Sequence, residues 1–471
     1  MRIIVVGVGE VGFRLAKVLS AEGHDVNVVE NNDERIGRAE AELDARVVRG
    51  SGARPQTLYD AGVVPGCNVD YLIACTERDE VNILSCMIAR RGGVKHVVAR
   101  ARSMEFTDSL DWADSLGIDM MFSPERSVAR EILELLSVSS AVHTAELLDG
   151  RAAIYAFRLS PDSPLVDMSL MEFRKRNPDL IAVVVYIERG EEDDIIPNGS
   201  TVLKKDDLCY VVSYREQVWR LEKLFQLKAT RSLKRVFIVG GGKLGFQVAR
   251  RLRMAYKGIE VRLIDKDREK CERLAAELPD VLVLSGDGAD ETLLRGEGID
   301  GADGYVAATD SDEVNMIYCA VAKSLGAVKC IAVVRRALYQ SMPDHLPLDA
   351  VVDPNEALAS VILRYIRYPG HSKALSIIER IDAEMLEIVL PSDTPLAGRA
   401  LMDLNVPQGV LVALVGRERK NVFVPVGKTI FEPEDHVILF ASTDRMPQAA
   451  EFFGSGVGSR RKFDKSEEVP E

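Results

Sequence analysis

An internal repeat does most to constrain how this chain of 471 residues can fold. The glycine-rich segment at residues 7–12, GVGEVG, recurs 233 residues later at residues 240–245 as GGGKLG. Further matches follow in the same order, pairing residues 26–30 with 261–265, 50–52 with 286–288, and 76–82 with 309–315. A chain that matches itself over so long a period must consist of two similar halves.

A second, different pattern repeats after these segments. Residues 163–165 resemble residues 394–396, and residues 197–208 resemble residues 425–436. Each half therefore contains a larger domain followed by a smaller one. We predict larger domains at residues 1–138 and 232–369, smaller domains at residues 139–228 and 370–453, and a disordered tail of glycine, serine and charged residues at 454–471.

The larger domains have the pattern of a doubly wound α/β sheet. Short apolar runs at residues 3–6 and 26–29 flank a glycine turn and a stretch with apolar residues at helical spacing. Further apolar runs alternate with helices, so the sheet should be mostly parallel and covered on both faces. The smaller domains alternate strands with turns and are predicted to be compact α+β modules. The fold class is thus two tandem Rossmann-like domains, each followed by a small α+β domain.

Two helices should join the larger domains to the smaller ones, at residues 125–137 and 355–367. Each has a wide apolar face, formed by Val128, Ile132, Leu135 and Leu136 in the first helix and by Val361, Ile362, Tyr365 and Ile366 in the second. Such a face needs a partner surface. That surface can lie within the same domain or in a neighbouring domain of an assembly of chains.

Composition narrows the classes of partner and the compartment. Lys and Arg number 60 against 73 Asp and Glu, a net charge of −13 that argues against a nucleic-acid partner. The longest apolar stretches, at residues 181–187 and 410–415, fall well short of the ~20 residues that cross a bilayer. The seven cysteines form no CxxC pair and the six histidines are not spaced three or four apart. We therefore expect no disulfide framework, no metal site and a reducing cytoplasm.

The glycine segments carry the clearest chemical signal. In GxGxxG the first glycine permits a tight turn, the second lets the backbone approach a pyrophosphate, and the third lets the helix pack on the strand. Each copy lies between a predicted strand and a predicted helix, and an acid, Glu30 or Asp265, ends the next strand. A carboxylate there can bind the ribose hydroxyls and would repel a 2′-phosphate, which favours NAD(H) over its phosphorylated form. Adenine mononucleotides such as ATP or ADP remain an alternative.

Other polar residues lie where a nucleotide would meet the edge of the sheet. Ser51 and Asp287 sit in Gly-x-Gly turns after the third strands, where they could meet the adenine or simply form β-turns. Residues 76–77 and 309–310, Thr-Glu and Thr-Asp, end the fourth strands, where doubly wound folds bind ligands. Capping the next helix is an equally good role for both threonines.

Charged residues distinguish the two halves. Arg100 ends the fifth strand of the first half and could meet phosphate, or be a solvated surface residue, whereas Val333 takes its place in the second. Glu10 and Lys243 occupy the same position of the glycine turn, at the start of a helix where a bound phosphate would lie. Because a carboxylate repels phosphate and an ammonium attracts it, the second half should tolerate a triphosphate and the first should prefer NAD(H).

The predicted nucleotide-binding residues fall into two matching sets, and we predict neither catalytic nor metal-binding residues. The sets are Gly7, Val8, Gly9, Glu10, Val11, Gly12, Glu30, Ser51, Thr76, Glu77 and Arg100 in the first half, and Gly240, Gly241, Gly242, Lys243, Leu244, Gly245, Asp265, Asp287, Thr309 and Asp310 in the second.

These motifs resemble those of the TrkA family. The resemblance rests on GVGEVG with Glu30, GSG, TERDEVN and ARAR, followed by a small domain, all duplicated over roughly residues 1–453. It implies regulator-of-potassium-conductance domains that bind NAD(H), with ATP or ADP as alternatives. It further implies a homo-oligomeric ring, expected to be a tetramer, attached to the inner face of the cell membrane through a potassium-conducting integral membrane subunit. In this ring the helices at residues 125–137 and 355–367 are expected to cross to a neighbouring domain, so that the chains assemble through the larger domains. It thus implies a ligand-gated cytoplasmic regulator of potassium uptake and no enzyme.

The alternative function is an NAD-dependent oxidoreductase with one degenerate half. Such an enzyme needs a general acid beside the nicotinamide, commonly His, Lys or Tyr, and a domain that holds substrate. The two smaller domains share no matched His or Cys. The sequence therefore favours the regulator.

Overall fold

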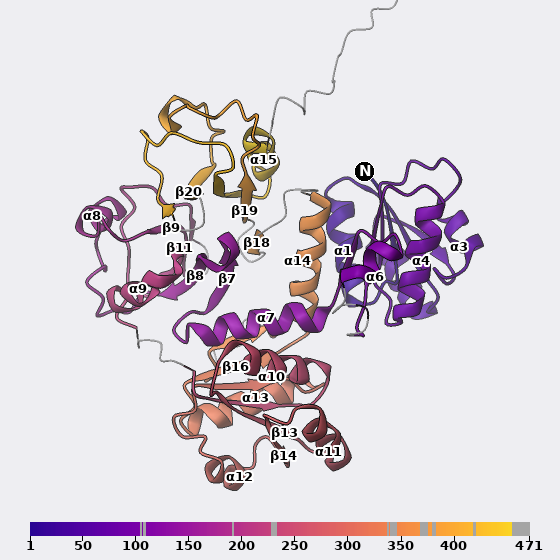
Figure 1. Cartoon of the computed structure of the whole chain (residues 1–471), viewed down its shortest axis with the longest axis horizontal. Coiled ribbons are helices and arrows are strands. Elements are labelled where there is room, and N and C mark those ends of the chain that lie inside the picture. Colours follow the sequence, from indigo (N-terminus) through magenta and orange to yellow (C-terminus); the bar gives the residue numbers. More distant parts are fainter. Residues whose placement is uncertain are drawn as a thin grey trace, which may run out of the picture. The chain divides into compact units, whose positions relative to one another are not determined.

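The computed structural model describes residues 1–103, 106, 110–190, 193–227, 233–336, 339, 346–367, 375–378, 383–417 and 421–454. The chain divides into two compact units that do not follow its order. One contains residues 1–133 and 233–366, and the other contains residues 134–232 and 367–471. The first unit thus holds the two larger domains and the second the two smaller ones (Figure 1). The predicted tail, apart from its first residue, lies outside the described residues.

The first larger domain is a six-stranded parallel sheet in the order β3-β2-β1-β4-β5-β6. Its strands are β1 (Arg2–Val6), β2 (Asp25–Glu30), β3 (Arg46–Arg49), β4 (Tyr71–Ala74), β5 (His96–Arg100) and β6 (Met120–Phe122). The helices packed around this sheet are α1 (Glu10–Ala21), α2 (Asp33–Glu42), α3 (Pro55–Asp60), α4 (Asp79–Arg91) and α6 (Leu110–Ser115) (Figure 1). The strand order reverses between β1 and β4, which creates the crevice where doubly wound folds bind ligands.

The second larger domain repeats this architecture in the order β14-β13-β12-β15-β16-β17. Its strands are β12 (Arg235–Val239), β13 (Glu260–Asp265), β14 (Leu282–Ser285), β15 (Gly304–Ala307), β16 (Lys329–Val333) and β17 (Ala350–Val352). Its helices are α10 (Lys243–Ala255), α11 (Arg268–Glu277), α12 (Glu291–Gly296) and α13 (Asp312–Ser324). The central strands are apolar because both faces are covered, and residues 3–6 and 236–239 are at most 3% exposed. The two predicted parallel sheets are confirmed.

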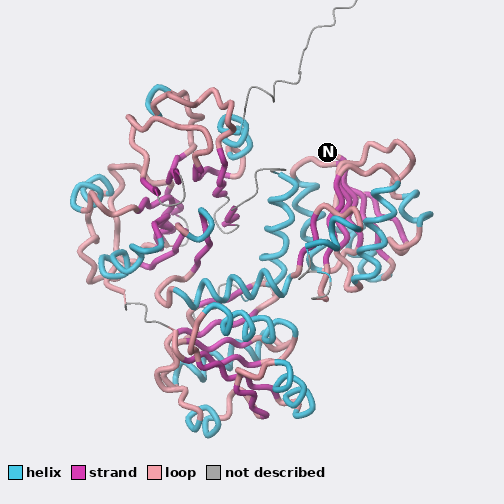
Figure 2. The backbone as a smooth tube through the Cα atoms, viewed as in Figure 1, coloured by secondary structure: helices cyan, strands magenta, loops and turns pink. Residues whose placement is uncertain are grey.

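The smaller domains are antiparallel sheets with short helices, as predicted (Figure 2). The first has the strand order β10-β9-β11-β8-β7 and consists of β7 (His143–Leu147), η1 (Leu148–Gly150), β8 (Ala152–Arg158), α8 (Leu170–Arg176), β9 (Ala182–Arg189), β10 (Asp193–Ile195), β11 (Leu208–Tyr214), η2 (Arg215–Gln217) and α9 (Val218–Leu224). The second has the order β18-β19-β22-β20-β21 and consists of β18 (Leu375–Ile378), β19 (Ala383–Val389), η6 (Leu401–Asp403), β20 (Leu411–Arg417), β21 (Asn421–Phe423), β22 (His436–Ser442) and α15 (Met446–Gly454). The two sheets share one apolar core, in which Tyr186 packs against Phe440.

The predicted joining helices are present as α7 (Pro124–Ser137) and α14 (Pro354–Arg367). Their apolar faces are covered within the chain, since Val128, Ile132 and Ile362 are fully buried. Tyr365 of α14 makes edge contacts with the rings of Tyr71 and His96, at centroid distances of 6.2 and 6.4 Å. For α14, the partner surface is therefore partly supplied by the other larger domain of the same chain.

A buried ion pair also joins the two larger domains. Nη1 of Arg14, in α1, lies 3.6 Å from Oδ2 of Asp353, the residue that precedes α14. The side chain of Asp353 is only 3% exposed and accepts a hydrogen bond from the backbone N–H of Asn355 at 2.8 Å. Burial raises the pKa of Asp353 to about 6, against the lowering effects of Asn355 and Arg14. The helix that follows the first glycine turn, α1, is thus linked to α14 through a carboxyl group that can titrate under mildly acidic conditions.

Asp353 should make stability depend on pH in this range. Its ordinary pKa is 3.8 and its native pKa about 6, so between these values the native state holds a proton that the unfolded chain releases. The free energy of unfolding must therefore fall as pH rises through this window, by about 3 kcal/mol for a shift of about two units. Asp353→Asn, neutral and of the same shape, should raise the midpoint of thermal unfolding at about pH 7.5 and change it little at about pH 4.5. If the midpoints of thermal unfolding of the variant and the parent differ by the same amount at every pH in this range, the raised pKa of Asp353 is contradicted. Asp353→Ser, which introduces the residue that the first half carries at Ser123, serves as a second neutral variant.

Candidate nucleotide-binding site

The first glycine turn has the geometry that its sequence predicts. Gly7 has φ +88°, and a Cβ there would come within 2.8 Å of Cγ2 of Thr76. A Cβ on Gly12 would lie 1.9 Å from the carbonyl oxygen of Gly7. At Gly9, by contrast, the nearest atom to a Cβ would be Nη1 of Arg35 at 3.7 Å, which leaves this backbone open to a ligand.

The second turn repeats these features. Gly240 has φ +102°, and a Cβ there would lie 2.5 Å from the carbonyl oxygen of Ala308. A Cβ on Gly245 would lie 1.9 Å from the carbonyl oxygen of Gly240. Within the described chain, nothing lies within 4 Å of a Cβ on Gly242. Gly9 and Gly242 are the N-caps of α1 and α10, so each helix begins at an open glycine whose neighbouring N–H groups can receive a phosphate.

The predicted ribose acids bond to the second residue of each turn. Oε2 of Glu30 accepts a hydrogen bond from the N–H of Val8 at 2.8 Å, and Oδ2 of Asp265 accepts one from the N–H of Gly241 at 2.7 Å. Both carboxylates therefore lie beside the turn at the carboxyl edge of the sheet. Each half thus offers an open phosphate cradle with an acid next to it, a combination that fits an adenine dinucleotide.

Three turn residues contribute backbone alone. The side chains of Val8 and Val11 are buried at 2% and 5% exposure, and that of Leu244 is half-buried. These residues were predicted because they lie within the glycine motif. Their side chains pack against the rest of the domain, so only their backbone faces the site.

Thr76 and Thr309 serve to tie neighbouring strands together. Oγ1 of Thr76 donates to Oδ1 of Asn82 at 2.7 Å, and Nδ2 of Asn82 donates to the carbonyl oxygen of Arg100 at 2.9 Å. Thr309 bonds to Asn315 in the same way at 2.6 Å. Both asparagines are fully buried. This network fixes the ends of the fourth and fifth strands beside the first glycine, a role we did not predict although the asparagine ends both repeated motifs.

The remaining predicted residues of the two sets differ in their surroundings. Ser51 accepts a hydrogen bond from the N–H of Ala53, and Asp287 accepts one from Ala289, so both stabilise the β-turns that were their alternative role. Oδ2 of Asp287 also pairs with Lys266 at 3.0 Å. The exposed Glu77 and Asp310 lie after β4 and β15 and pair with arginines, at 3.3 and 3.9 Å.

Arg100 is the predicted residue with the least satisfied side chain. Its Nε is buried and has no hydrogen-bond partner among the described residues. Burial, and then the neighbouring Arg102, lower the pKa of Arg100 below its ordinary value. A guanidinium in such surroundings at the carboxyl end of β5 is suited to receive an anion. The second half has Val333 at this position and therefore lacks the guanidinium.

The contrast between Glu10 and Lys243 is weaker than the sequence suggested. Both side chains are exposed at the helix start, but Glu10 pairs with Nη1 of Arg38 at 3.0 Å. The repulsion that Glu10 was expected to exert on a phosphate is therefore partly offset. Arg35 adds a second guanidinium above Gly9. Neither arginine was predicted, since only the fold brings α2 against the glycine turn.

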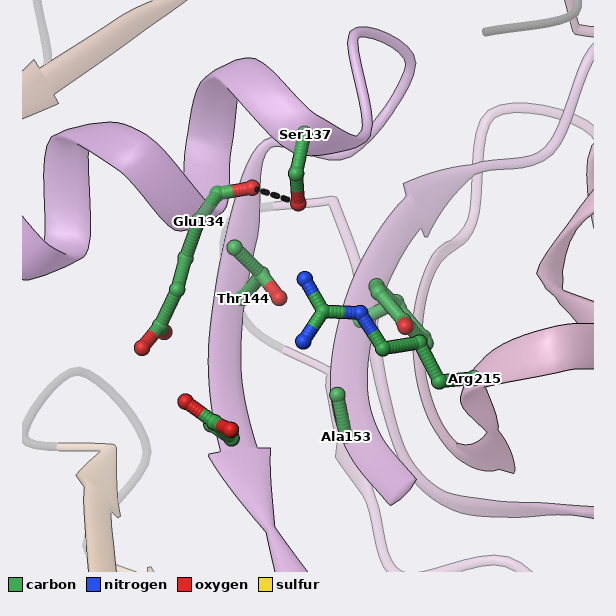
Figure 3. Close-up of a pocket in the computed structure, with 7 residues that line it drawn as sticks. Glu134, Ser137, Thr144, Ala153 and Arg215 are labelled. Carbon is green, nitrogen blue, oxygen red and sulfur yellow. Dashed lines mark hydrogen bonds between the residues drawn. The ribbon is translucent and has the colours of Figure 1, made fainter. Parts of the chain in front are cut away.

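The pocket in Figure 3 lies where the end of α7 meets the first smaller domain. It is lined by Glu134, Ser137, Thr144, Glu146, Ala153, Tyr155 and Arg215, and it includes none of the predicted residues. Within the described residues, no group of three or more His, Cys, Asp or Glu side chains could hold a metal ion. Across the same residues, no helix is both long and apolar enough to span a membrane.

Comparison with known domains decides the family. Residues 3–124 and 236–354 match the TrkA-N domain, and residues 154–226 and 385–454 match the TrkA-C domain. The chain belongs to the TrkA family. The Trk system potassium uptake protein TrkA homolog 1 of Methanosarcina mazei is 31% identical over 461 residues, covering 96% of this chain and 100% of the relative. The Trk system potassium uptake protein TrkA of Vibrio alginolyticus is 30% identical over 454 residues, covering 93% and 95%.

Solved structures share the fold. The structure of the GsuK channel bound to NAD superposes with a TM-score of 0.60 at 19% identity, covering 96% of this chain and 78% of the channel chain. At this identity the likeness concerns the fold alone. It agrees with the tandem TrkA-N and TrkA-C organisation found from the sequence.

Proposed function

We propose that this protein is the nucleotide-binding regulatory subunit of a potassium uptake system, and that it controls potassium flux through an integral membrane partner. The observation that carries the proposal is the full-length match to Trk system potassium uptake proteins, which spans both halves of the chain. A nucleotide that bridges a glycine turn and the acid of the neighbouring strand would favour one arrangement of its domain. Differential binding to two arrangements is what lets a ligand gate a partner.

The ligand we propose is NAD(H), with ATP or ADP as alternatives. The open glycines would accept its phosphates on the N–H groups of α1 and α10, and the carboxylates of Glu30 and Asp265 would bind its ribose hydroxyls. In the first half, Arg35 and Arg100 would add cations near the phosphates. Bound nucleotide would supply the gating signal. The fold of the chain holds the N–H groups, carboxylates and arginines in position to bind it.

We infer that the protein acts without catalysis, in a homo-oligomeric ring, expected to be a tetramer, on the cytoplasmic side of the membrane. With a net charge of −13 it should be repelled by anionic lipid, so attachment would run through the potassium-conducting subunit. The alternative remains an oxidoreductase with one degenerate half. Steady oxidation of NADH with a candidate substrate would favour that alternative.

Two nucleotides should bind per chain, because each half has its own turn and acid. Titration calorimetry should give two sites for NADH in the parent protein and about one each in Glu30→Ala and Asp265→Ala. Glu40→Ala, which removes an exposed acid of α2, should leave both sites. The proposal fails if one substitution abolishes all binding, or if neither changes it.

A further inference from the structure

Matching positions of the two halves direct their cations to different ends of the site. Arg35 and Lys270 lie five residues after Glu30 and Asp265, respectively. The guanidinium of Arg35 lies over the glycine turn and pairs with a residue at the end of β4. Nζ of Lys270 instead lies 2.7 Å from Oδ2 of Asp265. The first half thus places this cation at the phosphate end of the site, and the second places it at the ribose end.

In the first half, the ribose acid has no cation beside it. Glu30 is 5% exposed and accepts hydrogen bonds from three backbone N–H groups at 2.8–3.0 Å. It forms no ion pair with any Lys or Arg of the described chain, and Arg35 and Arg38 of α2 pair with other acids. A phosphate on the ribose would meet an uncompensated carboxylate here.

In the second half, two lysines flank the corresponding acid. Although burial opposes it, hydrogen bonds from Lys270 and from the backbone of Asp267 and Gly241 hold the pKa of Asp265 below its ordinary value. Lys266, which takes the place of Asn31, pairs with the carboxylate that follows β14 at 3.0 Å. The five residues after the acid carry a net charge of +1 in this half, KDREK, against −1 in the first half, NNDER.

Lys266 also contacts the turn after β14 and the aromatic ring behind it. Its Nζ lies 5.9 Å from the ring centroid of Tyr318, whose place in the first half is taken by Ser85. Hydrogen bonds to Asp287 and Tyr318 raise the pKa of Lys266 above its ordinary value. A Cβ on Gly288 would come within 2.9 Å of the Tyr318 ring, which therefore backs the turn closely. Lys266 is thus positioned beside the ribose end of the second site.

We propose that the second half accepts an adenine dinucleotide with a phosphate on the adenosine ribose, whereas the first half accepts only the unphosphorylated dinucleotide. A ribose phosphate can draw the ammonium of Lys270 away from Asp265 and share that of Lys266, since it carries more charge than either carboxylate. At Glu30 no such exchange is available. This inference rests on the proposed function, which assigns a dinucleotide to each half.

The test is calorimetric titration of the full chain with NADH and with NADPH. The parent should bind two molecules of NADH and one of NADPH. Lys270→Ala should weaken NADPH about tenfold and NADH less than about twofold, the size expected when one partly exposed cation is lost. Lys270→Arg, which keeps a cation at this position, should bind NADPH about as tightly as the parent does. Arg295→Ala, which removes an exposed cation of α12 that pairs with Glu291, should leave NADPH affinity unchanged. Lys266→Ala gives a second, independent reduction should Lys270→Ala fold poorly.

The outcomes separate this inference from the proposed function. Two NADH sites with either two NADPH sites or none would overturn the inference alone. So would a Lys270→Ala variant that loses NADH and NADPH affinity to the same extent. Absence of NADH binding in both halves would overturn the proposed function and, with it, this inference.

Discussion

Alanine at Gly12 should remove the first of the two nucleotide-binding sites, and alanine at Gly245 should remove the second. In each case the new Cβ would stand 1.9 Å from a backbone carbonyl oxygen, that of Gly7 or of Gly240. Backbone cannot move aside as a flexible side chain can, so the turn must open and the helix must shift from its strand. We expect nucleotide affinity at the affected site to fall at least about a hundredfold, or about 3 kcal/mol. Equilibrium titration of NADH should then give one site per chain in each variant.

Alanine at two other glycines separates folding from binding. Gly242 has open space around it, so alanine fits the domain there and yet intrudes where a pyrophosphate would approach. Gly242→Ala should melt like the parent and still lose the second site. Gly37, inside α2, is equally open and lies outside both turns, so Gly37→Ala should keep both sites. Unchanged stoichiometry in Gly12→Ala and Gly245→Ala would contradict the assignment of the turns.

The sequence predicts the sheets well because their signals are local. An apolar run, a glycine turn and a helical pattern follow one another in both halves, and the repeat shows that neither copy is accidental. The glycines and the two acids were predicted for the same reason, since each role depends on position relative to one strand. The pairing of β1 with β4 then brings Thr76 against Gly7 without any further signal.

The contacts that the sequence did not predict depend on segments brought together by folding. Glu10 was expected to repel phosphate, but α2 places Arg38 beside it. Arg35 and Lys270 occupy one position of the repeat and bind different partners, Glu77 and Asp265 respectively. The apolar faces of α7 and α14 were predicted, and the resemblance favoured a neighbouring domain of the ring as their cover, whereas part of the α14 face packs on the other larger domain of the same chain. Side-chain pairing across elements has no local pattern, and it decides how the two halves differ.

The smaller domains contain the same buried ion pair in both copies of the second sequence repeat. Arg189, at the end of β9, donates from Nε and Nη2 to both carboxylate oxygens of Asp207, each at 2.8 Å. Arg417, at the end of β20, makes the same two bonds to Asp435, also at 2.8 Å. Both aspartates have fully buried side chains. They are the last residue but one of the matching segments 197–208 and 425–436, so the same contact occurs at the same place in both copies.

Removing one partner of this pair should destabilise its domain strongly. In Asp207→Ala the guanidinium of Arg189 and the N–H of Lys204, which donates to Asp207 at 2.7 Å, would both lose their acceptor. Breaking a buried pair in this way costs about 3–5 kcal/mol, and the partial exposure of Arg189 places the expected loss near about 3 kcal/mol. Glu172→Ala breaks an exposed pair in α8 of the same domain and should change stability by less than about 1 kcal/mol. Chemical unfolding followed by circular dichroism measures both variants. Equal stabilities for the two would mean that the buried pair contributes no more than a surface one, and that the repeated motif is held by its turn instead.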